Sequence, residues 1–263
     1  MLGAIIGDIV GSRFERKNYK ATDFELFTDD CHFTDDTVMT VAVAKALLES
    51  DGDWDALDTN AVKYMQKFGR RYPNCGYGQM FWLWLRKRNP KPYNSLGNGS
   101  AMRVSPVAYT AKTLEQCLDL SDAVTKISHD HPQGVLGAQA TAVATWAALH
   151  DWKKQEIKEL IQDQFYDLNF TIDELRPNYR FDATCPGSVP QAIKAFLESK
   201  GFEDAIRLAV SIGGDSDTIA AITGGIAGAY YGIPDDLIVK AMEYLPEDLS
   251  NVVAEFGRTY CLK

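Results

Sequence analysis

Two short acidic clusters carry the most distinctive chemistry in the sequence. One is Thr34-Asp35-Asp36, directly before an expected helix that begins at Thr37. The other is Asp215-Ser216-Asp217-Thr218, which follows two glycines and also runs into an expected helix. Carboxylates and hydroxyls are hard oxygen ligands, which suit Mg²⁺ or Mn²⁺ and argue against zinc or copper. If the clusters face each other across a cleft, they predict a site for divalent metal ions.

A helix N-cap is the simpler interpretation of each cluster. Asp, Ser and Thr at a helix start accept hydrogen bonds from free backbone N–H groups and complement the helix dipole. A cap needs only one oxygen-bearing side chain, however, and each cluster supplies at least three. Carboxylates that are crowded together also repel one another unless a cation or a proton lies between them. Spacing alone leaves both interpretations open and favours the metal site.

Composition narrows the class of protein. The chain has 263 residues, a formal charge of −9 and a pI near 5.0. A net anion repels nucleic-acid backbones and anionic membranes, so neither is expected as a partner. The five cysteines are scattered without a CxxC pair, and no signal peptide or membrane-length apolar run is apparent. We therefore expect a cytoplasmic protein with reduced thiols, and a monomer by default.

Helical periodicity dominates the elements that must position these clusters. Gly3, Gly7 and Gly11 recur at every fourth position, which predicts an N-terminal helix that another backbone approaches closely. Only Asn169 to Asp173 has the composition of a short strand. The fold expected is all-α, a single compact orthogonal bundle of ten or more helices that forms one domain over residues 1–263. Further helices are expected over 37–48, 54–70, 113–127, 134–149, 153–166, 188–199, 203–211, 217–231, 235–244 and 248–260.

Five segments in order carry a family resemblance. They are Gly7 to Glu15 (GDIVGSRFE), Phe33 to Met39 (FTDDTVM), Gly97 to Arg103 (GNGSAMR), Ser128-His129, and Gly213 to Ala220 (GGDSDTIA). Together they resemble the ADP-ribosylglycohydrolase family, and the similarity extends from residue 3 to about residue 232. The resemblance implies an all-α fold with a binuclear metal cleft and two Mg²⁺ or Mn²⁺ ions as cofactors.

The resemblance also implies residue roles. Asp35 and Glu15 are the candidate catalytic groups, and sequence does not separate their acid and base roles. Leu96 departs from the family pattern, because a serine-linkage member has an aromatic residue there. The implied metal ligands are Thr34, Asp35, Asp36, Asp215, Asp217 and Thr218. The implied substrate-binding residues are Ser95, Leu96, Gly97, Asn98, Gly99, Ser100 and His129, of which 95–99 would wrap a diphosphate.

Several other residues have a structural interpretation that competes with a functional one. We expect Asp8 and Arg103 to form a buried ion pair or separate polar contacts. We expect His131 to be exposed or to cap a helix. Residues 182–187 are expected in a loop that lines the cleft, and Cys185 is not a candidate nucleophile because no basic neighbour would lower its pKa. The aromatic side chains Tyr72, Tyr77 and Phe81 are expected to pack in the core rather than stack on an adenine.

The function expected is metal-dependent hydrolysis of the glycosidic bond at the distal ribose of an ADP-ribosylated protein or small molecule, with release of ADP-ribose. One alternative is a non-catalytic ADP-ribose-binding or structural member of the same family. Another is a phosphoesterase that acts on ADP-ribose and releases AMP. Sequence leaves the acceptor open: arginine, serine, a carboxyl ester, O-acetyl-ADP-ribose and a nucleobase share the same distal-ribose chemistry.

Overall fold

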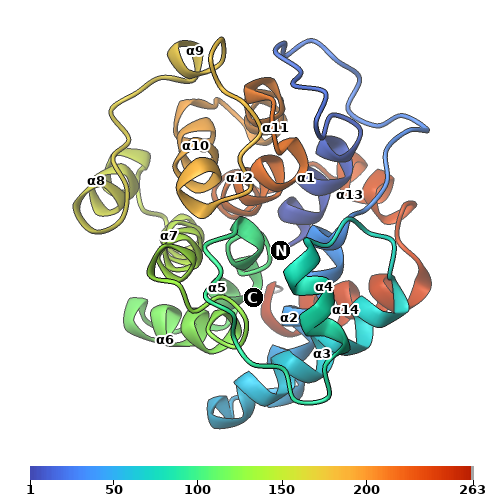
Figure 1. Ribbon diagram of the computed structural model, residues 1–263. Coiled ribbons are helices and arrows are strands. Elements are labelled where there is room, and N and C mark those ends of the chain that lie inside the picture. Colours follow the sequence, from blue (N-terminus) through green and yellow to red (C-terminus); the bar gives the residue numbers. More distant parts are fainter. Residues whose placement is uncertain (262–263) are drawn as a thin grey trace.

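Fourteen α-helices account for most of residues 1–261, the part of the chain that the computed structural model describes (Figure 1). Within this part no strand forms, and a single isolated bridge joins Gly97 to Thr184. The all-α prediction is confirmed. The helices are α1 (Leu2–Ser12), α2 (Asp35–Ser50), α3 (Leu57–Arg71), α4 (Gln79–Arg86), α5 (Ser105–Thr110), α6 (Leu114–Thr125), α7 (Pro132–Leu149), α8 (Lys154–Gln164), α9 (Ile172–Leu175), α10 (Cys185–Glu198), α11 (Phe202–Ile212), α12 (Ser216–Tyr231), α13 (Asp235–Met242) and α14 (Glu247–Phe256), with short segments η1 (Trp54–Ala56), η2 (Asn98–Ser100) and η3 (Gly257–Cys261).

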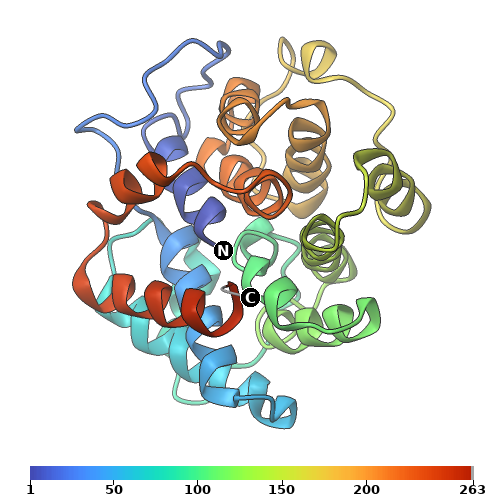
Figure 2. The ribbon, with the colours of Figure 1, turned by 180° about the vertical axis from the view of Figure 1, so that it is seen from behind.

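Helix α12 lies at the centre of the bundle. It contacts α1, α7, α10 and α11, and every residue from Ser216 to Ala227 is buried. A helix that is apolar all round must be enclosed on all sides, since no face of it gains from contact with water. Figure 2, which views the molecule from behind, shows the C-terminal helices (red) in front of the N-terminal ones (blue), where α14 packs on α2. The two acidic clusters therefore begin helices that belong to one core.

The glycines of α1 set the distance between α1 and α12. A Cβ placed on Gly3 would lie 2.0 Å from the carbonyl oxygen of Gly224, and one on Gly7 would lie 2.0 Å from that of Ala220. A Cβ on Gly11 would lie 2.5 Å from the Cα of Asp217. Real Cβ atoms do not approach this closely, so the seam requires glycine. The expected close approach of a second backbone is confirmed, and it brings the acidic start of α12 against α1.

Two local predictions are wrong, and capping explains both. Residues 169–173 form no strand, because Thr171 and Glu174 close a capping box that starts α9. Helix α10 begins at Cys185 rather than at Ser188, because the Thr184 side chain accepts a hydrogen bond from the backbone N–H of Gly187. Thr113 does cap α6 as expected. None of the helices within residues 1–261 combines the length and apolarity that crossing a bilayer requires.

Candidate active site

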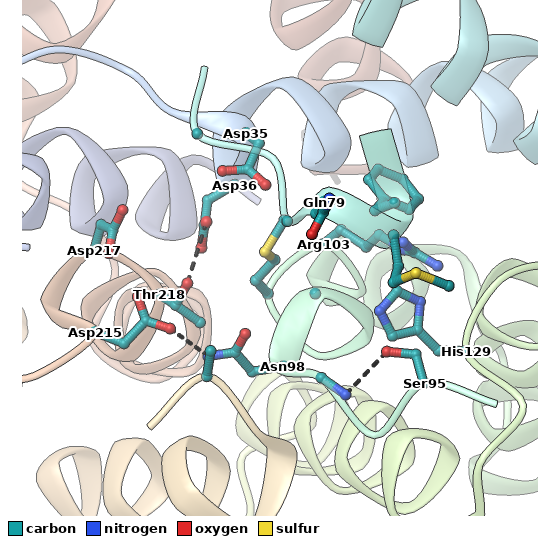
Figure 3. A pocket seen from close by; sticks show the side chains of 18 of the residues that line it. Asp35, Asp36, Gln79, Ser95, Asn98, Arg103, His129, Asp215, Asp217 and Thr218 are labelled. Atoms are coloured by element: carbon teal, nitrogen blue, oxygen red, sulfur yellow. Dashed lines mark hydrogen bonds between the residues drawn. The ribbon is translucent and has the colours of Figure 1, made fainter. Parts of the chain in front are cut away.

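A cavity of about 580 Å³ opens between the N-terminal ends of α2 and α12 on one side and residues 79–103 on the other (Figure 3). This volume lies within the range of about 300–1,000 Å³ that is typical of small-molecule sites. Both acidic clusters reach it, through Asp35, Asp36, Asp215, Asp217 and Thr218. The residues of the two clusters are about 180 positions apart in sequence, and the fold brings them to the same wall.

Asp8 anchors the first cluster. Its carboxylate accepts hydrogen bonds from the backbone N–H of Thr34 at 2.9 Å and from the Thr34 hydroxyl at 2.6 Å. It also accepts from the backbone N–H and the hydroxyl of Thr37. Asp8 therefore fixes the start of α2, where Thr34 is the N-cap residue and accepts from the N–H of Asp36. The cap interpretation holds for Thr34, whose hydroxyl already serves Asp8 and the helix end.

The second cluster meets the first directly. The Thr218 hydroxyl donates to Asp36 Oδ2 at 3.2 Å, across the boundary between α12 and α2. Carboxylate oxygens of Asp8, Asp36 and Asp217 all lie within 4.8 Å of one another, which is close enough to surround a metal ion. Asp8 was not among the predicted ligands. Three donors bond to its Oδ2 and one to its Oδ1, so Asp8 positions Thr34 and the start of α2 while Oδ1 keeps a free lone pair.

Asp215 is the residue directly before α12, but its side chain does not cap the helix. Its side chain makes no hydrogen bond to the helix end and instead accepts from Asn98 Nδ2 at 2.7 Å. The two residues before it, Gly213 and Gly214, have φ values of +77° and +71°. A Cβ at either position would lie 2.6 Å from a neighbouring side chain, at Asn18 and Tyr179 respectively. These glycines thus allow the tight turn that delivers Asp215 to the cavity.

The acidic wall, formed by Asp35, Asp36, Asp215 and Asp217, has no basic counterpart among residues 1–261. Burial and neighbouring carboxylates hold the pKa values of Asp35, Asp36 and Asp217 well above the usual range. In residues 1–261 no Lys, Arg or His forms an ion pair with any of these acids. Buried Oδ1 atoms of Asp36 and Asp217 also have no hydrogen-bond donor. Unpartnered, crowded, oxygen-only groups are what a divalent cation would satisfy, so the residues present fit the expected cofactor.

Residues 95–99 form the base of the opposite wall, whereas Ser100 is buried behind it and donates to the carbonyl of Gly134. Gly97 donates its N–H to Ser95 Oγ at 3.1 Å, and Asn98 donates its N–H to the carbonyl of Ala183 at 2.8 Å. We expected these two amides to face a phosphate, but both are already used within the protein. The Asn98 side chain holds Ser188 and Asp215 instead of pointing at a ligand. Asn98 therefore ties the loop to the acidic wall.

Arg103 and His129 lie across the cavity from the acids, as Figure 3 shows. The expected alternatives for Arg103 and Asp8 resolve in favour of separate contacts. Asp8 bonds only to Thr34 and Thr37, whereas Arg103 donates to the carbonyl of Val124 and to Ser128 Oγ. His131 caps α7 through its Nδ1, which accepts from the N–H of Gln133.

The mouth of the cavity contains residues that sequence patterns did not single out. Arg16 has a φ of +63° and pairs with Glu15 at 2.9 Å, while its guanidinium carbon lies 5.4 Å from the centroid of the Phe181 ring. Met80, Leu96 and Phe181 are exposed apolar side chains that line the same opening. Of these only Leu96 was predicted. A lone exposed aromatic in a loop gives little sequence signal.

The remaining predictions divide by position. Phe81 belongs to the core and also lines the cavity, while Tyr72 and Tyr77 pack only against the core. In residues 182–187 only Ala183 reaches the cavity, because Asp182 turns back to accept from the N–H of Thr184. Burial raises the pKa of Cys185 to about 12, which agrees with its exclusion as a nucleophile. All five cysteines are free.

Comparison with known proteins identifies the family. The profile of the ADP-ribosylglycohydrolase family matches residues 1–260. The chain belongs to this family. A mouse protein named ADP-ribosylhydrolase ARH3 (Mus musculus) is 24% identical over 98% of this chain and 87% of the relative. ADP-ribosylarginine hydrolase Tri1 of Pseudomonas putida (strain GB-1) is 28% identical over 89% of this chain and 70% of the relative.

A solved structure described as an ADP-ribosylglycohydrolase-related protein complex has the same fold as this chain. Its TM-score is 0.72 at 22% identity, over 98% of this chain and 97% of that chain. The predicted resemblance and the predicted enzyme class, a glycohydrolase, are both confirmed by the family. The individual site roles stay predictions.

Proposed function

We propose that this chain hydrolyses the glycosidic bond between the distal ribose of ADP-ribose and an acceptor, in a reaction that depends on two Mg²⁺ or Mn²⁺ ions. The observation that carries the proposal is the acidic wall. Asp35, Asp36, Asp215 and Asp217 line one cavity with Thr218, no basic side chain pairs with them in residues 1–261, and two of their buried oxygens lack donors. Both named relatives are called ADP-ribosyl hydrolases, which supports the ADP-ribose unit as substrate.

Different residues of the cavity would bind the metal ions, transfer the proton and bind the substrate. Asp35, Asp36, Asp215, Asp217 and Thr218 would hold the ions, which when bound supply Lewis acidity that activates water and orients a ribose. Thr34, predicted as a further ligand, would act as the cap that fixes the start of α2. Glu15 or Asp35 would move the proton. Water adds to the anomeric carbon, the bond to the acceptor breaks through an oxocarbenium-like state, and the acceptor leaves with a proton. Ser95, Leu96, Gly99 and His129, which line the cavity, would lie along the diphosphate side of the substrate.

Product analysis separates this function from its alternatives. The purified chain is incubated with peptides that carry ADP-ribose on arginine, serine or glutamate, and with O-acetyl-ADP-ribose, in Mg²⁺, in Mn²⁺ or in chelator. Chromatography that finds intact ADP-ribose, only with metal, supports the proposal. Release of AMP would identify a phosphoesterase instead. ADP-ribose binding without turnover of any conjugate would identify a non-catalytic binding protein.

We also propose that the chain acts as a cytoplasmic monomer on ADP-ribosylated proteins or small conjugates. The free cysteines and net negative charge support this assignment. Size-exclusion chromatography with light scattering tests the monomer: a mass near 29.2 kDa is expected, and twice that mass contradicts it.

A further inference from the structure

Arg103 is an unusual buried cation. Its side chain is fully buried, and no carboxylate in residues 1–261 pairs with it. Its Nη2 donates to the carbonyl of Val124 at 3.1 Å and to Ser128 Oγ at 2.7 Å. Its guanidinium carbon also lies 5.4 Å from the Phe81 ring centroid. A buried charge without a counter-ion is costly, so its position on the cavity wall calls for a functional reason.

The hydrogen bonds of Ser128 give a functional reason for the position of Arg103. Ser128 Oγ lies 2.9 Å from His129 Nδ1, and both residues are buried. A guanidinium can only donate, so the hydroxyl accepts from Arg103 and keeps its own hydrogen for another partner. Among the described residues the sole remaining partner of that hydroxyl is His129 Nδ1. A neutral imidazole that accepts at Nδ1 must carry its proton on Nε2.

The Nε2 atom faces the loop at the base of the cavity. A Cβ built on Gly99 would lie 3.3 Å from His129 Nε2, and one on Gly97 would lie 3.8 Å from it. No hydrogen-bond partner of Nε2 is present within residues 1–261. Glycine at position 99 therefore keeps open the space directly in front of this nitrogen.

We propose that Arg103 and Ser128 are positioning residues that hold His129 as the Nε2–H tautomer, so that the cavity presents a fixed N–H donor beside residues 97–99. The group that this donor suits is a ligand oxygen, above all an anionic one. A histidine held this way is neither a general base nor a metal ligand at Nε2, which leaves proton transfer to the carboxylates. The proposal rests on the proposed function only for naming that oxygen as part of the ADP-ribose diphosphate.

Electrostatics agree with the geometry. Burial and then the neighbouring charge of Arg103 hold the pKa of His129 well below its usual value, so the ring is neutral near pH 7. Burial lowers the pKa of Arg103 to about 10. Because this value is still well above 7, the guanidinium carries its charge at neutral pH. Arg103 thus supplies the hydrogen bond that orients Ser128 and the charge that keeps His129 neutral.

The tautomer can be read directly by NMR of ¹⁵N-histidine-labelled protein without ligand. The chain has four histidines, and His129→Gln assigns the signals of interest. The wild type should show a protonated Nε2 and an unprotonated Nδ1 at His129. A proton on Nδ1, or a doubly protonated ring at pH 7, would overturn the proposal whether or not any variant folds.

Two variants test whether the hydrogen bond from Ser128, rather than general packing, fixes the tautomer of His129. Ser128→Ala removes the donor to Nδ1, and a mixture of both tautomers is expected. Thr125→Val is the control, because it removes a nearby buried hydroxyl that has no hydrogen-bond partner. Its spectrum should match the wild type. A wild-type tautomer in Ser128→Ala, or equal changes in both variants, would show that Ser128 does not position the ring.

Affinity for ADP-ribose, measured by titration calorimetry, links the tautomer to the ligand. Ser128→Ala should weaken binding about two- to threefold, because only the fraction of molecules in the Nε2–H tautomer can donate to the ligand, and Thr125→Val should bind as the wild type does. Unchanged affinity with an altered tautomer would remove the ligand role of the donor. If the wild type neither binds ADP-ribose nor cleaves any conjugate, the proposed function fails while the tautomer result stands.

Discussion

The two walls of the cavity have opposite electrostatic character. The acidic wall is built from the starts of α2 and α12 and contains carboxylates that no base neutralises. Among residues 75–103, which supply most of the facing wall, the lining side chains include no Asp or Glu and one cation, Arg103. Arg103 is fully buried and has no acidic partner among the described residues either. The protein thus keeps buried charges of both signs apart.

This separation indicates what the cavity is built to receive. If the charges served stability, an ion pair between the walls would neutralise both and reduce the cost of burying them. Left apart, they complement a ligand that brings cations to one end and an anionic group to the other. A diphosphate ester with a ribose held near divalent ions has that distribution. Burying unpaired ionisable groups at both walls lowers the free energy of unfolding, and ligand binding is what these groups would serve.

The largest expected effect comes from neutralising one carboxylate of the acidic wall. Asp217→Asn should reduce kcat/KM at least a thousandfold, because it removes the charge of a proposed metal ligand. The buried Oδ1 atom of Asp217 has no hydrogen-bond donor within residues 1–261. In chelator the same variant should be at least as stable as the wild type, since it removes one of several crowded charges. Initial rates of ADP-ribose release and melting curves in EDTA measure both effects.

The exposed Asp163, which does not line the cavity, provides the control for that experiment. Asp163→Asn should leave rate and melting temperature near wild-type values. An Asp217→Asn variant that retains wild-type activity would contradict the assignment of the acidic wall as the metal site.

Metal binding should have the next largest effect, on stability. A ligand at 100 times its Kd adds about 2.7 kcal/mol to the free energy of unfolding. Mg²⁺ or Mn²⁺ should therefore raise the melting temperature of the wild type, and should not raise that of Asp217→Asn. NaCl at equal ionic strength is the control, because simple screening also weakens repulsion between the carboxylates. An equal rise in NaCl would mean that screening, rather than a bound divalent ion, explains the stabilisation.

The seam between α1 and α12 tests whether the acidic wall depends on backbone spacing. Gly7→Ala should lower the free energy of unfolding by about 1–3 kcal/mol, the usual cost of overpacking, because its Cβ would meet the carbonyl of Ala220. To relieve this clash, α12 would have to move away from α1 and so change its position relative to α2. The metal-dependent rise in melting temperature should therefore also become smaller. Urea titration with and without Mg²⁺ measures both.

Gly257→Ala is the matched substitution, because its added Cβ meets no atom within 4 Å and its φ of −58° suits alanine. It should leave stability and the metal response unchanged. A Gly7→Ala variant as stable as Gly257→Ala would show that α1 and α12 can separate without cost.

Sequence predicted the acidic wall far better than the facing wall. The acids of the first wall fall in two short clusters at helix starts, so residue type and local spacing revealed them. The seam glycines were visible for the same reason, through their period of four. Asp8 was missed as the anchor of Thr34, because its contacts span 26 and 29 positions and depend on how α1 meets α2.

The facing wall depends on tertiary contacts that no local pattern encodes. Arg103, Ser128 and His129 were all noticed, yet their order of hydrogen bonding follows only from the distances between them. Phe181 and Arg16 come from separate loops and meet only at the cavity mouth. The start of α10 was predicted at Ser188 rather than at Cys185, because Thr184 and Ser188 are both capping residues and the fold decides which of them caps the helix. Helices α4 and α5 were not among the predicted helix ranges.

Leu96 offers the smallest expected effect and the clearest contrast with Asp217. Its side chain is about one-third exposed at the mouth of the cavity and contacts no part of the acidic wall through a hydrogen bond. Leu96→Ala should raise KM a few-fold, in keeping with the loss of partial apolar burial of a ligand, and should leave kcat and the metal-dependent melting shift unchanged. Val239→Ala, an exposed apolar side chain away from the cavity, is the control and should alter neither constant. A fall in kcat for Leu96→Ala would mean that the two walls are not separable, because a contact on the facing wall would then act on the chemistry at the acidic wall.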